Sequence, residues 1–246
     1  MSRIRNVVFP ALGLLVACTT PQPKPADPDL VACDEVEDRV SRLDGVFTTH
    51  PGHRIALADP RLAGWDWRFH VFEDDEPYAF ALPNGVVGVT TGLLALALNE
   101  AQHAGILFHE MAHVVHARPE RAHLCAELLP FLSEGSRDGA ISAPAFVDAV
   151  IALELENPYS PEEEEAADRD GLLLVAGAAH TPLGMIRVFE RLAAQNAAAP
   201  PRLFLVHPPA KDRVAALRRH LAAAMTHYYA SKHGGSSLIY GIDLRN

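Results

Sequence analysis

The hydrophobic and polar positions along the chain predict short strands followed by long helices. Three runs have the alternating or continuous apolar pattern of strands, residues 67–72, 78–82 and 86–90, the last of them after a Pro83-Asn84-Gly85 turn. Helical patterns cover residues 34–46, 91–98 and 101–117. The aliphatic and alanine-rich remainder favours a mainly helical α+β fold, while residues 226–246 carry no pattern that we could assign.

The helix expected over residues 101–117 is apolar nearly all round, which predicts that it lies inside the domain. It nevertheless carries His109, Glu110, His113 and His116, and a buried helix seldom holds polar side chains without a purpose. His109 and His113 share one face because they are four residues apart, so both imidazoles can reach one metal ion. The H-E-x-x-H spacing is typical of zinc hydrolases, in which the glutamate is the general base toward a water molecule on the metal. His116 lies one turn beyond His113, and we expect it to pack in the core or to hold one of the metal-binding side chains in place.

A third ligand is expected on a second helix, which starts at Ser160. Ser160 suits the N-cap, Pro161 the first helical position, and Glu163 a capping box. On a helical wheel Glu164 and Asp168 lie about 40° apart in the sector of an apolar stripe, whereas the remaining charges, Asp170 among them, fall on the solvent side. Glu164 would bind the metal and Asp168 would accept the second N–H of a ligand imidazole. The alternative is a coincidental acidic cluster.

The N-terminus predicts export from the cytoplasm. Residues 1–17 combine Arg3 and Arg5 with a short apolar run, as a secretory signal peptide does. They end in Leu15-Val16-Ala17-Cys18, which resembles the lipobox of bacterial lipoproteins and implies a lipid on Cys18; the alternative is an ordinary signal with an accidental cysteine. In that family Thr19 favours the outer membrane. Residues 18–30 are proline-rich and predict an extended tether, which leaves residues 31–246 as one domain.

Cysteine content and net charge indicate the compartment of the protein and exclude some kinds of partner. Cys33 and Cys125 are an even pair in an oxidising compartment, so we expect either a disulfide or two buried thiols. The net charge of −10 argues against nucleic acid as a partner and gives no support to peripheral binding of anionic lipid.

Four motifs in order resemble the HtpX, BepA and LoiP type of zinc metallopeptidase, peptidase family M48, over nearly all of the domain. They are Ala79-Phe80-Ala81-Leu82-Pro83-Asn84-Gly85 with Thr91-Gly92-Leu93-Leu94; His109 to Val115; Tyr159-Ser160 with Glu164, Ala167, Asp168 and Arg169; and His207-Pro208-Pro209 with Arg213. Departures are Tyr78 for the usual Asn, Pro161 for Arg, and His116-Ala117-Arg118 after the metal helix. They put substrate preference and the support of the ligands in doubt, and they leave the metal-binding positions intact.

The resemblance implies a gluzincin-like domain with a small antiparallel or mixed sheet beside the H-E-x-x-H helix. One Zn²⁺ per chain would be held by His109, His113 and Glu164, with Glu110 as the base and Asp168 orienting His109. A histidine such as His207 can approach the metal or stabilise the oxyanion; the alternative is that it packs against the Pro208-Pro209 turn.

Two functions are compatible with these features. The first is an endopeptidase, lipid-anchored in the bacterial envelope and facing the periplasm at the outer membrane, that degrades misfolded or damaged envelope proteins. Its unfolded or extended substrates would pair with residues 83–89 if these form a sheet edge. The second is a metal-bearing assembly or binding factor of the outer membrane with weak or latent proteolysis.

Overall fold

The computed structural model describes residues 28–49, 59–62, 65–116, 123–138, 141–194, 202–207 and 210–233. The signal peptide, Cys18 and residues 19–27 of the tether lie outside these ranges. The elements follow in the order α1 (Pro28–Val40), β1 (Val46–Thr49), η2 (Pro60–Leu62), β2 (Arg68–Phe72), β3 (Ala79–Ala81), β4 (Val86–Thr90), α2 (Thr91–Leu96), α3 (Glu100–Val115), α4 (His123–Asp138), α5 (Ala143–Glu156), α6 (Pro161–Gly177), α7 (Leu183–Ala194), α8 (Leu203–Val206) and α9 (Ala210–His233).

The four strands form one mixed sheet in the order β1-β2-β4-β3. β2 runs parallel to β4, and β1 and β3 run antiparallel to their neighbours. β4 is buried at every residue, as its mainly apolar sequence favours. It follows β3 through the Pro83-Asn84-Gly85 turn, where Gly85 has a φ of 92°. Residues 83–89 do not meet the condition set for substrate pairing, that they form a sheet edge, because β4 lies between β2 and β3. The edge strand on this side of the sheet is β3.

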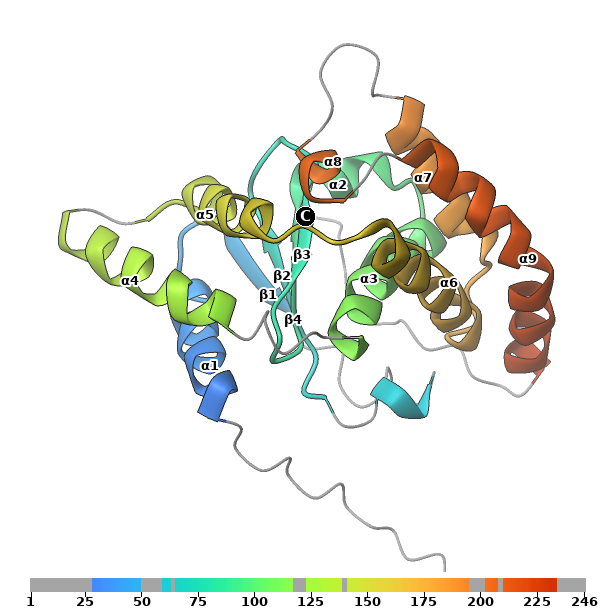
Figure 1. The fold of residues 1–246 in the computed structure, drawn as a ribbon, viewed down its shortest axis with the longest axis horizontal. Helices are drawn as coiled ribbons and strands as arrows, with labels where there is room; N and C mark the ends of the chain where they lie inside the picture. The colour runs from blue at the N-terminus through green and yellow to red at the C-terminus, as the bar shows by residue number, and fades with distance from the viewer. Residues whose placement is uncertain are drawn as a thin grey trace, which may run out of the picture.

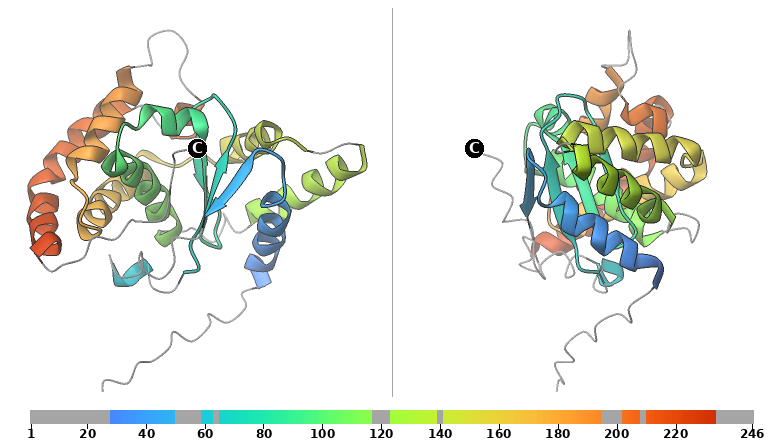
Figure 2. Two further views of the ribbon diagram at one scale, coloured as in Figure 1. Left: turned by 180° about the vertical axis from the view of Figure 1, so that it is seen from behind. Right: turned by 90° about the vertical axis from the view of Figure 1, so that its left-hand side faces the viewer.

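Helices cover both faces of this sheet (Figure 1). α3, α6, α7 and α9 lie on one side, and α1, α4 and α5 lie on the other, as the views from behind and from the side also show (Figure 2). The sheet and α5 share an aromatic core in which the rings of Phe72, Phe80 and Phe146 have centroids 5.5 to 6.1 Å apart. The predicted mainly helical α+β class with a small mixed sheet is confirmed.

Two glycines let α3 and α7 pack with their backbones almost in contact. A Cβ atom on Gly105 would lie 2.6 Å from the Met185 Cα, and one on Gly184 would lie 2.5 Å from the carbonyl carbon of Ala101. These distances are too short for any side chain, so glycine is required at both crossing points. The close packing fixes α7 against the helix that carries the H-E-x-x-H motif.

The first helix differs from its predicted position. α1 begins at Pro28, three residues inside the segment predicted as tether, because proline is well suited to the first turn of a helix. It ends at Val40 and not at residue 46, since Gly45 turns the chain at a φ of 78° and Val46 then pairs with Phe72. At the other end, α9 includes residues 226–233 of the unassigned tail.

A disulfide joins Cys33 on α1 to Cys125 on α4, and both residues are fully buried. Of the two alternatives for these cysteines, the structure has the bridge. Among the helices that the structure describes, none combines the length and the apolar composition that a membrane span requires.

Candidate metal centre

α3 brings the H-E-x-x-H side chains into the interior, as its apolar sequence predicts. The helix begins at Asn99, whose side chain accepts a hydrogen bond from the backbone N–H of Gln102 and so caps the first turn. His109, Glu110 and His113 are 4%, 2% and 5% exposed. Buried polar groups need partners, and these three face α6 and the segment after α8.

α6 supplies the acidic side chains opposite them. Its N-terminus has the predicted capping box, in which the Ser160 hydroxyl accepts from the Glu163 backbone and the Glu163 carboxylate accepts from the Ser160 backbone. Glu164 and Asp168 are both 1% exposed, so the wheel placed them on the correct face. Gly171 brings the two helices together, because a Cβ atom there would lie 3.1 Å from the His109 Cα.

The donor atoms of His109, His113 and Glu164 have the spacing that a zinc ion needs. The two Nε2 atoms are 3.1 Å apart, and oxygens of Glu164 lie 3.5 Å from the Nε2 of His109 and 3.4 Å from that of His113. A tetrahedral zinc with ligands at about 2.0–2.1 Å separates its donors by roughly 3.3–3.4 Å. Two imidazoles and a carboxylate are also a usual donor set for zinc, so the residues fit the ion.

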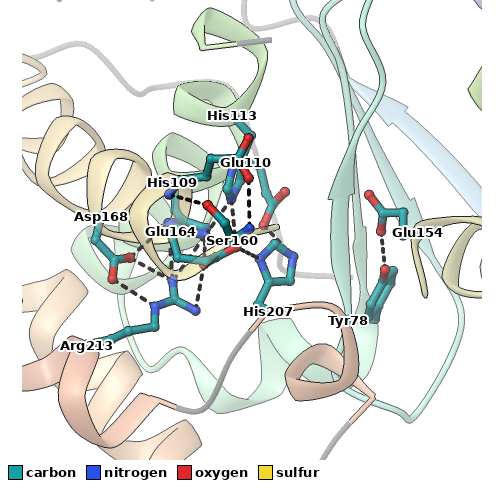
Figure 3. A network of polar contacts seen from close by, with 11 residues as sticks. Tyr78, His109, Glu110, His113, Glu154, Ser160, Glu164, Asp168, His207 and Arg213 are labelled. Atoms are coloured by element: carbon teal, nitrogen blue, oxygen red, sulfur yellow. Dashed lines mark hydrogen bonds and ion pairs between the residues drawn. The ribbon is translucent and has the colours of Figure 1, made fainter. Parts of the chain in front are cut away.

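Asp168 lies behind the first histidine, as predicted (Figure 3). Its Oδ1 is 3.0 Å from the Nδ1 of His109. Nε2 of His109 is therefore left to face His113 and Glu164, and the three side chains together form the donor group. Burial alone would lower the pKa of His109, but its hydrogen bonds with Asp168 and Glu164 raise that pKa to about 9. In contrast, burial lowers the pKa of His113 to about 3.

Arg213 of α9 forms ion pairs with the two buried carboxylates, Asp168 and Glu164. Its Nε donates to Oδ2 of Asp168 over 2.8 Å, its Nη2 donates to Oδ1 over 2.7 Å, and its Nη1 is 2.9 Å from Oε2 of Glu164. Burial opposes ionisation of both acids, yet His207 and Arg213 hold the pKa of Glu164 well below its usual range, and Arg213 lowers that of Asp168. Arg213 ends the H-P-x-x-x-x-R motif in the sequence, but the motif alone gave it no role.

His207 joins the same group from the end of α8. Its Nδ1 lies 2.7 Å from Oε1 of Glu164, and ligand-type atoms of His109, His113, Glu164 and His207 all lie within 4.8 Å of one another. The structure therefore places His207 at the centre; Pro208 and Pro209, the subject of the packing alternative, lie outside the described residues.

Glu110 points toward the donor group with one carboxylate oxygen that makes no hydrogen bond within the described residues. This oxygen is its buried Oε2, while its Oε1 is 3.9 Å from the Nε2 of His207. A buried carboxylate left with free acceptor capacity can take a proton from a molecule that enters the site.

Tyr159 is a site residue to which the motif gave no role. Its ring stacks on the imidazole of His113 with centroids 3.8 Å apart and planes 21° apart, and it also lies beside His207. The ring fixes the orientation of His113 in the way that Asp168 fixes His109. In the sequence Tyr159 stands directly before the N-cap Ser160, and this position does not predict its contact with His113.

The side of α6 predicted to face solvent is partly buried. Asp170 is 6% exposed and accepts hydrogen bonds from Arg61 and from Nε of Arg169, while its Oδ2 lies 3.0 Å from Nε2 of His116. The solvent-side prediction for Asp170 is wrong, because η2 packs over this side of the helix. His116 thus supports α6 and is not part of the donor group.

Comparison with known proteins shows which family and which relatives the chain resembles. The model of "Peptidase family M48" matches residues 51–221. A putative beta-barrel assembly-enhancing protease of Vibrio cholerae is 31% identical over 66% of this chain and 36% of its own length. The mitochondrial metalloendopeptidase OMA1 of Schizosaccharomyces pombe is 31% identical over 68% of the chain and 50% of its own. The beta-barrel assembly-enhancing protease of Escherichia coli K12 is 27% identical over 62% and 34%. The matches thus cover a third to a half of these relatives.

Proposed function

The chain belongs to peptidase family M48, and on that premise we propose that it is a zinc-dependent endopeptidase anchored in the bacterial envelope, where it hydrolyses misfolded or damaged proteins. The observation that carries this proposal is the convergence of His109, His113 and Glu164 beside Glu110, whose Oε2 has no hydrogen-bond partner within the described residues. Each of these groups would be costly to bury alone, so their convergence in the core favours a metal site.

His109, His113 and Glu164 would hold the zinc ion, one per chain. When bound, zinc polarises the scissile carbonyl and lowers the pKa of water to about 7. Asp168 fixes the His109 tautomer, and Arg213 keeps Asp168 and Glu164 ionised so that both remain acceptors.

Glu110 acts as the general base in this proposal. Its free Oε2 takes the proton from the attacking water and returns it to the leaving amine as the peptide bond breaks. Protonated His207 is the candidate for stabilising the carbonyl oxygen as it becomes negatively charged. Its Nδ1 donates to Oε1 of Glu164, and its buried Nε2, which has no hydrogen-bond partner within the described residues, then carries a second proton to donate.

An extended polypeptide would align along the outer edge of β3, which has no further strand beside it within the described residues. The residues of β3 are buried, so this edge must be uncovered before a substrate pairs with it. Tyr78 and Leu82 hydrogen-bond with Thr90 and Val86, so in this antiparallel pair alternate residues bond to β4 and the backbone groups of Ala79 and Ala81 point away from it. Those groups can pair with a substrate strand of almost any sequence, which suits an enzyme for unfolded proteins.

The envelope location rests on residues outside the described ranges and on the disulfide. The signal peptide and Cys18 support export and lipid attachment, and a buried Cys33–Cys125 bridge is expected where the surroundings are oxidising. Lipid attachment is tested by incorporation of radiolabelled lipid followed by membrane fractionation. The wild type should carry label in the outer-membrane fraction, and a Cys18→Ser protein that kept the full label would exclude the anchor.

A metal-bearing assembly factor is the second candidate, because bacterial relatives bear names that refer to beta-barrel assembly. The test compares zinc content and cleavage of unfolded casein in the wild type and in Glu110→Gln. We expect one zinc per chain in both proteins and cleavage by the wild type alone. A wild type that holds zinc but cuts no unfolded protein that the variant spares would favour the assembly factor.

A further inference from the structure

Tyr78 and Glu154 form a buried hydrogen bond to one side of the donor group (Figure 3). The Tyr78 hydroxyl donates to Oε2 of Glu154, and the two residues are 0% and 2% exposed. A buried polar pair seldom adds more stability than an apolar pair of the same shape. What the polar pair adds is direction, because a hydrogen bond forms only when its two groups are correctly oriented. This bond therefore favours a role in fixing the position of one element relative to another.

Tyr78 is a firmly held point of attachment at the start of β3. Its backbone N–H donates to Oγ1 of Thr90 over 2.9 Å, and its carbonyl accepts from the Thr90 backbone N–H over 3.0 Å. Its ring packs beside that of Phe80 in the aromatic core, with centroids 6.3 Å apart. Burial and the charge of Glu154 raise the pKa of Tyr78 well above its usual value, so the hydroxyl keeps its proton and remains a donor.

Glu154 lies at the end of α5 from which the chain crosses to α6. α5 ends at Glu156, and residues 157–160 alone separate it from α6. The backbone N–H of Asn157 donates to the carbonyl of Glu154, so this connection begins at the residue that Tyr78 holds. Its other end is fixed by the capping box of Ser160. Four residues that are fastened at both ends have little conformational freedom.

Tyr159 lies within this connection. Its ring is 7% exposed, stacks on the imidazole of His113 with centroids 3.8 Å apart, and lies 5.5 Å from the ring of His207. The place of this ring depends on where the connection begins, and the bond between Tyr78 and Glu154 determines that point. A hydroxyl on the edge strand is thus linked, through α5, to the orientation of a metal-binding histidine.

We propose that Tyr78 is a positioning residue for the metal centre. Through Glu154 it fixes the segment that carries Tyr159, and the ring of Tyr159 holds the His113 imidazole in the orientation that binds the ion. The inference rests on the zinc site of the proposed function, and it gives a role to the residue that stands in place of the usual Asn. The Tyr78 side chain acts only through these residues and contacts neither the ion nor the substrate.

The zinc affinity of conservative variants, measured by competition with a chelating dye, tests the proposal. Tyr78→Phe removes only the donor oxygen and should raise the Kd for zinc about fivefold or more. Glu154→Gln still offers an oxygen that can accept from Tyr78 and should stay within about threefold of the wild type. Tyr229→Phe, the same change at a position that is 54% exposed, is the control. A Tyr78→Phe protein with the Kd of the control would overturn the proposal.

A double variant separates positioning from stability. Tyr78→Phe combined with Glu154→Leu replaces the polar pair by an apolar one, so no carboxylate remains buried at this place. The melting temperature of the metal-free protein should then recover much of what Tyr78→Phe alone loses. The Kd for zinc should stay raised, because no directional bond fixes the end of α5. Recovery of the wild-type Kd together with the melting temperature would show that the bond only stabilises the fold. The double variant also provides the affinity test if Tyr78→Phe does not fold.

Proton NMR of the metal-free protein separates failure of this inference from failure of the proposed function. The stacked ring of Tyr159 shifts the imidazole protons of His113 upfield, and their signal is assigned by its loss in His113→Asn. We expect Tyr78→Phe to reduce this upfield shift, and Glu154→Gln and Tyr229→Phe to leave it unchanged. A wild type that binds no zinc, or binds it and cuts no peptide, would refute the proposed function, while the NMR shift would still decide whether Tyr78 positions the His113 ring. An unchanged shift in Tyr78→Phe would contradict that role.

Discussion

Oδ1 of Asp168 lies 3.0 Å from Nδ1 of His109, and both oxygens of the same carboxylate accept hydrogen bonds from Arg213. The three residues come from α6, α3 and α9, so this contact connects three helices through one buried carboxylate. It also fixes which nitrogen of His109 is available to a metal ion.

Loss of the Asp168 charge should weaken zinc binding without removing a ligand. Asp168→Asn preserves the size of the side chain but no longer favours the His109 tautomer, and we expect zinc affinity to fall about 10- to 100-fold. Competition with a chelating dye measures the affinity. Asp148→Asn, an exposed position on α5, serves as the control, and equal affinities for the two variants would show that the carboxylate does not support the site.

The ring of Tyr159 should matter for zinc binding more than its hydroxyl. Tyr159→Phe keeps the stack on His113 and should retain affinity within a factor of about three, whereas Tyr159→Leu should lose about tenfold because the imidazole is no longer held. Thermal unfolding of the metal-free proteins controls for a general loss of stability. Similar affinities for the Phe and Leu variants would argue against a role of the ring.

The contacts of Asp170 predict a stability effect that depends on pH. Burial would raise the pKa of this carboxyl, but hydrogen bonds with Arg61 and Arg169 lower it below its usual value. A depressed folded pKa contributes stability above the unfolded pKa of about 3.9, and this contribution is lost as pH falls through the folded value. Asp170→Asn should therefore reduce the free energy of unfolding at pH 7 by about 1–3 kcal/mol.

Denaturant unfolding of metal-free protein at several pH values measures this difference between wild type and Asp170→Asn. Followed from about pH 5 downward, the difference should shrink below about pH 4. A difference that grew on acidification would contradict the assigned direction of the pKa shift.

The disulfide should stabilise the fold without affecting the metal centre. The bond joins positions 92 residues apart on α1 and α4, across the sheet from α3 and α6. We expect the double variant Cys33→Ala, Cys125→Ala to lose about 2–5 kcal/mol of unfolding free energy while it retains one zinc per chain below its melting temperature. An unchanged unfolding free energy would mean that the bridge adds no stability.

Periodicity predicts the parts of the site that lie on single helices. A spacing of four residues puts His109 and His113 on one face of α3, and the same spacing puts Glu164 and Asp168 on one face of α6. The role of Arg213 does not follow from its motif, because its contact with Asp168 depends on how α9 packs against α6. The wheel fails at Asp170 for the same reason: it reports the side of a helix, not which segment covers that side.

The ends of the elements near the sheet, and the order of its strands, also do not follow from the pattern of hydrophobic and polar residues. The pattern that predicts a helix over residues 34–46 does not show where this helix ends. The turn at Gly45 and the pairing of β1 with β2 end it earlier. Likewise, whether Val86 to Thr90 lies at an edge depends on β2, which precedes β3 in the chain and yet pairs with β4.

The zinc content of Glu164→Gln tests the central claim most directly, because Glu164 is the ligand that joins α6 to the two histidines of α3. Glu162→Gln, an exposed change on the same turn of α6, is the control. With equal zinc supplied and the metal counted after removal of the excess, we predict one zinc per chain in the wild type and in Glu162→Gln, and far less than one in a folded Glu164→Gln. A Glu164→Gln protein that binds one zinc as tightly as the wild type would contradict the account.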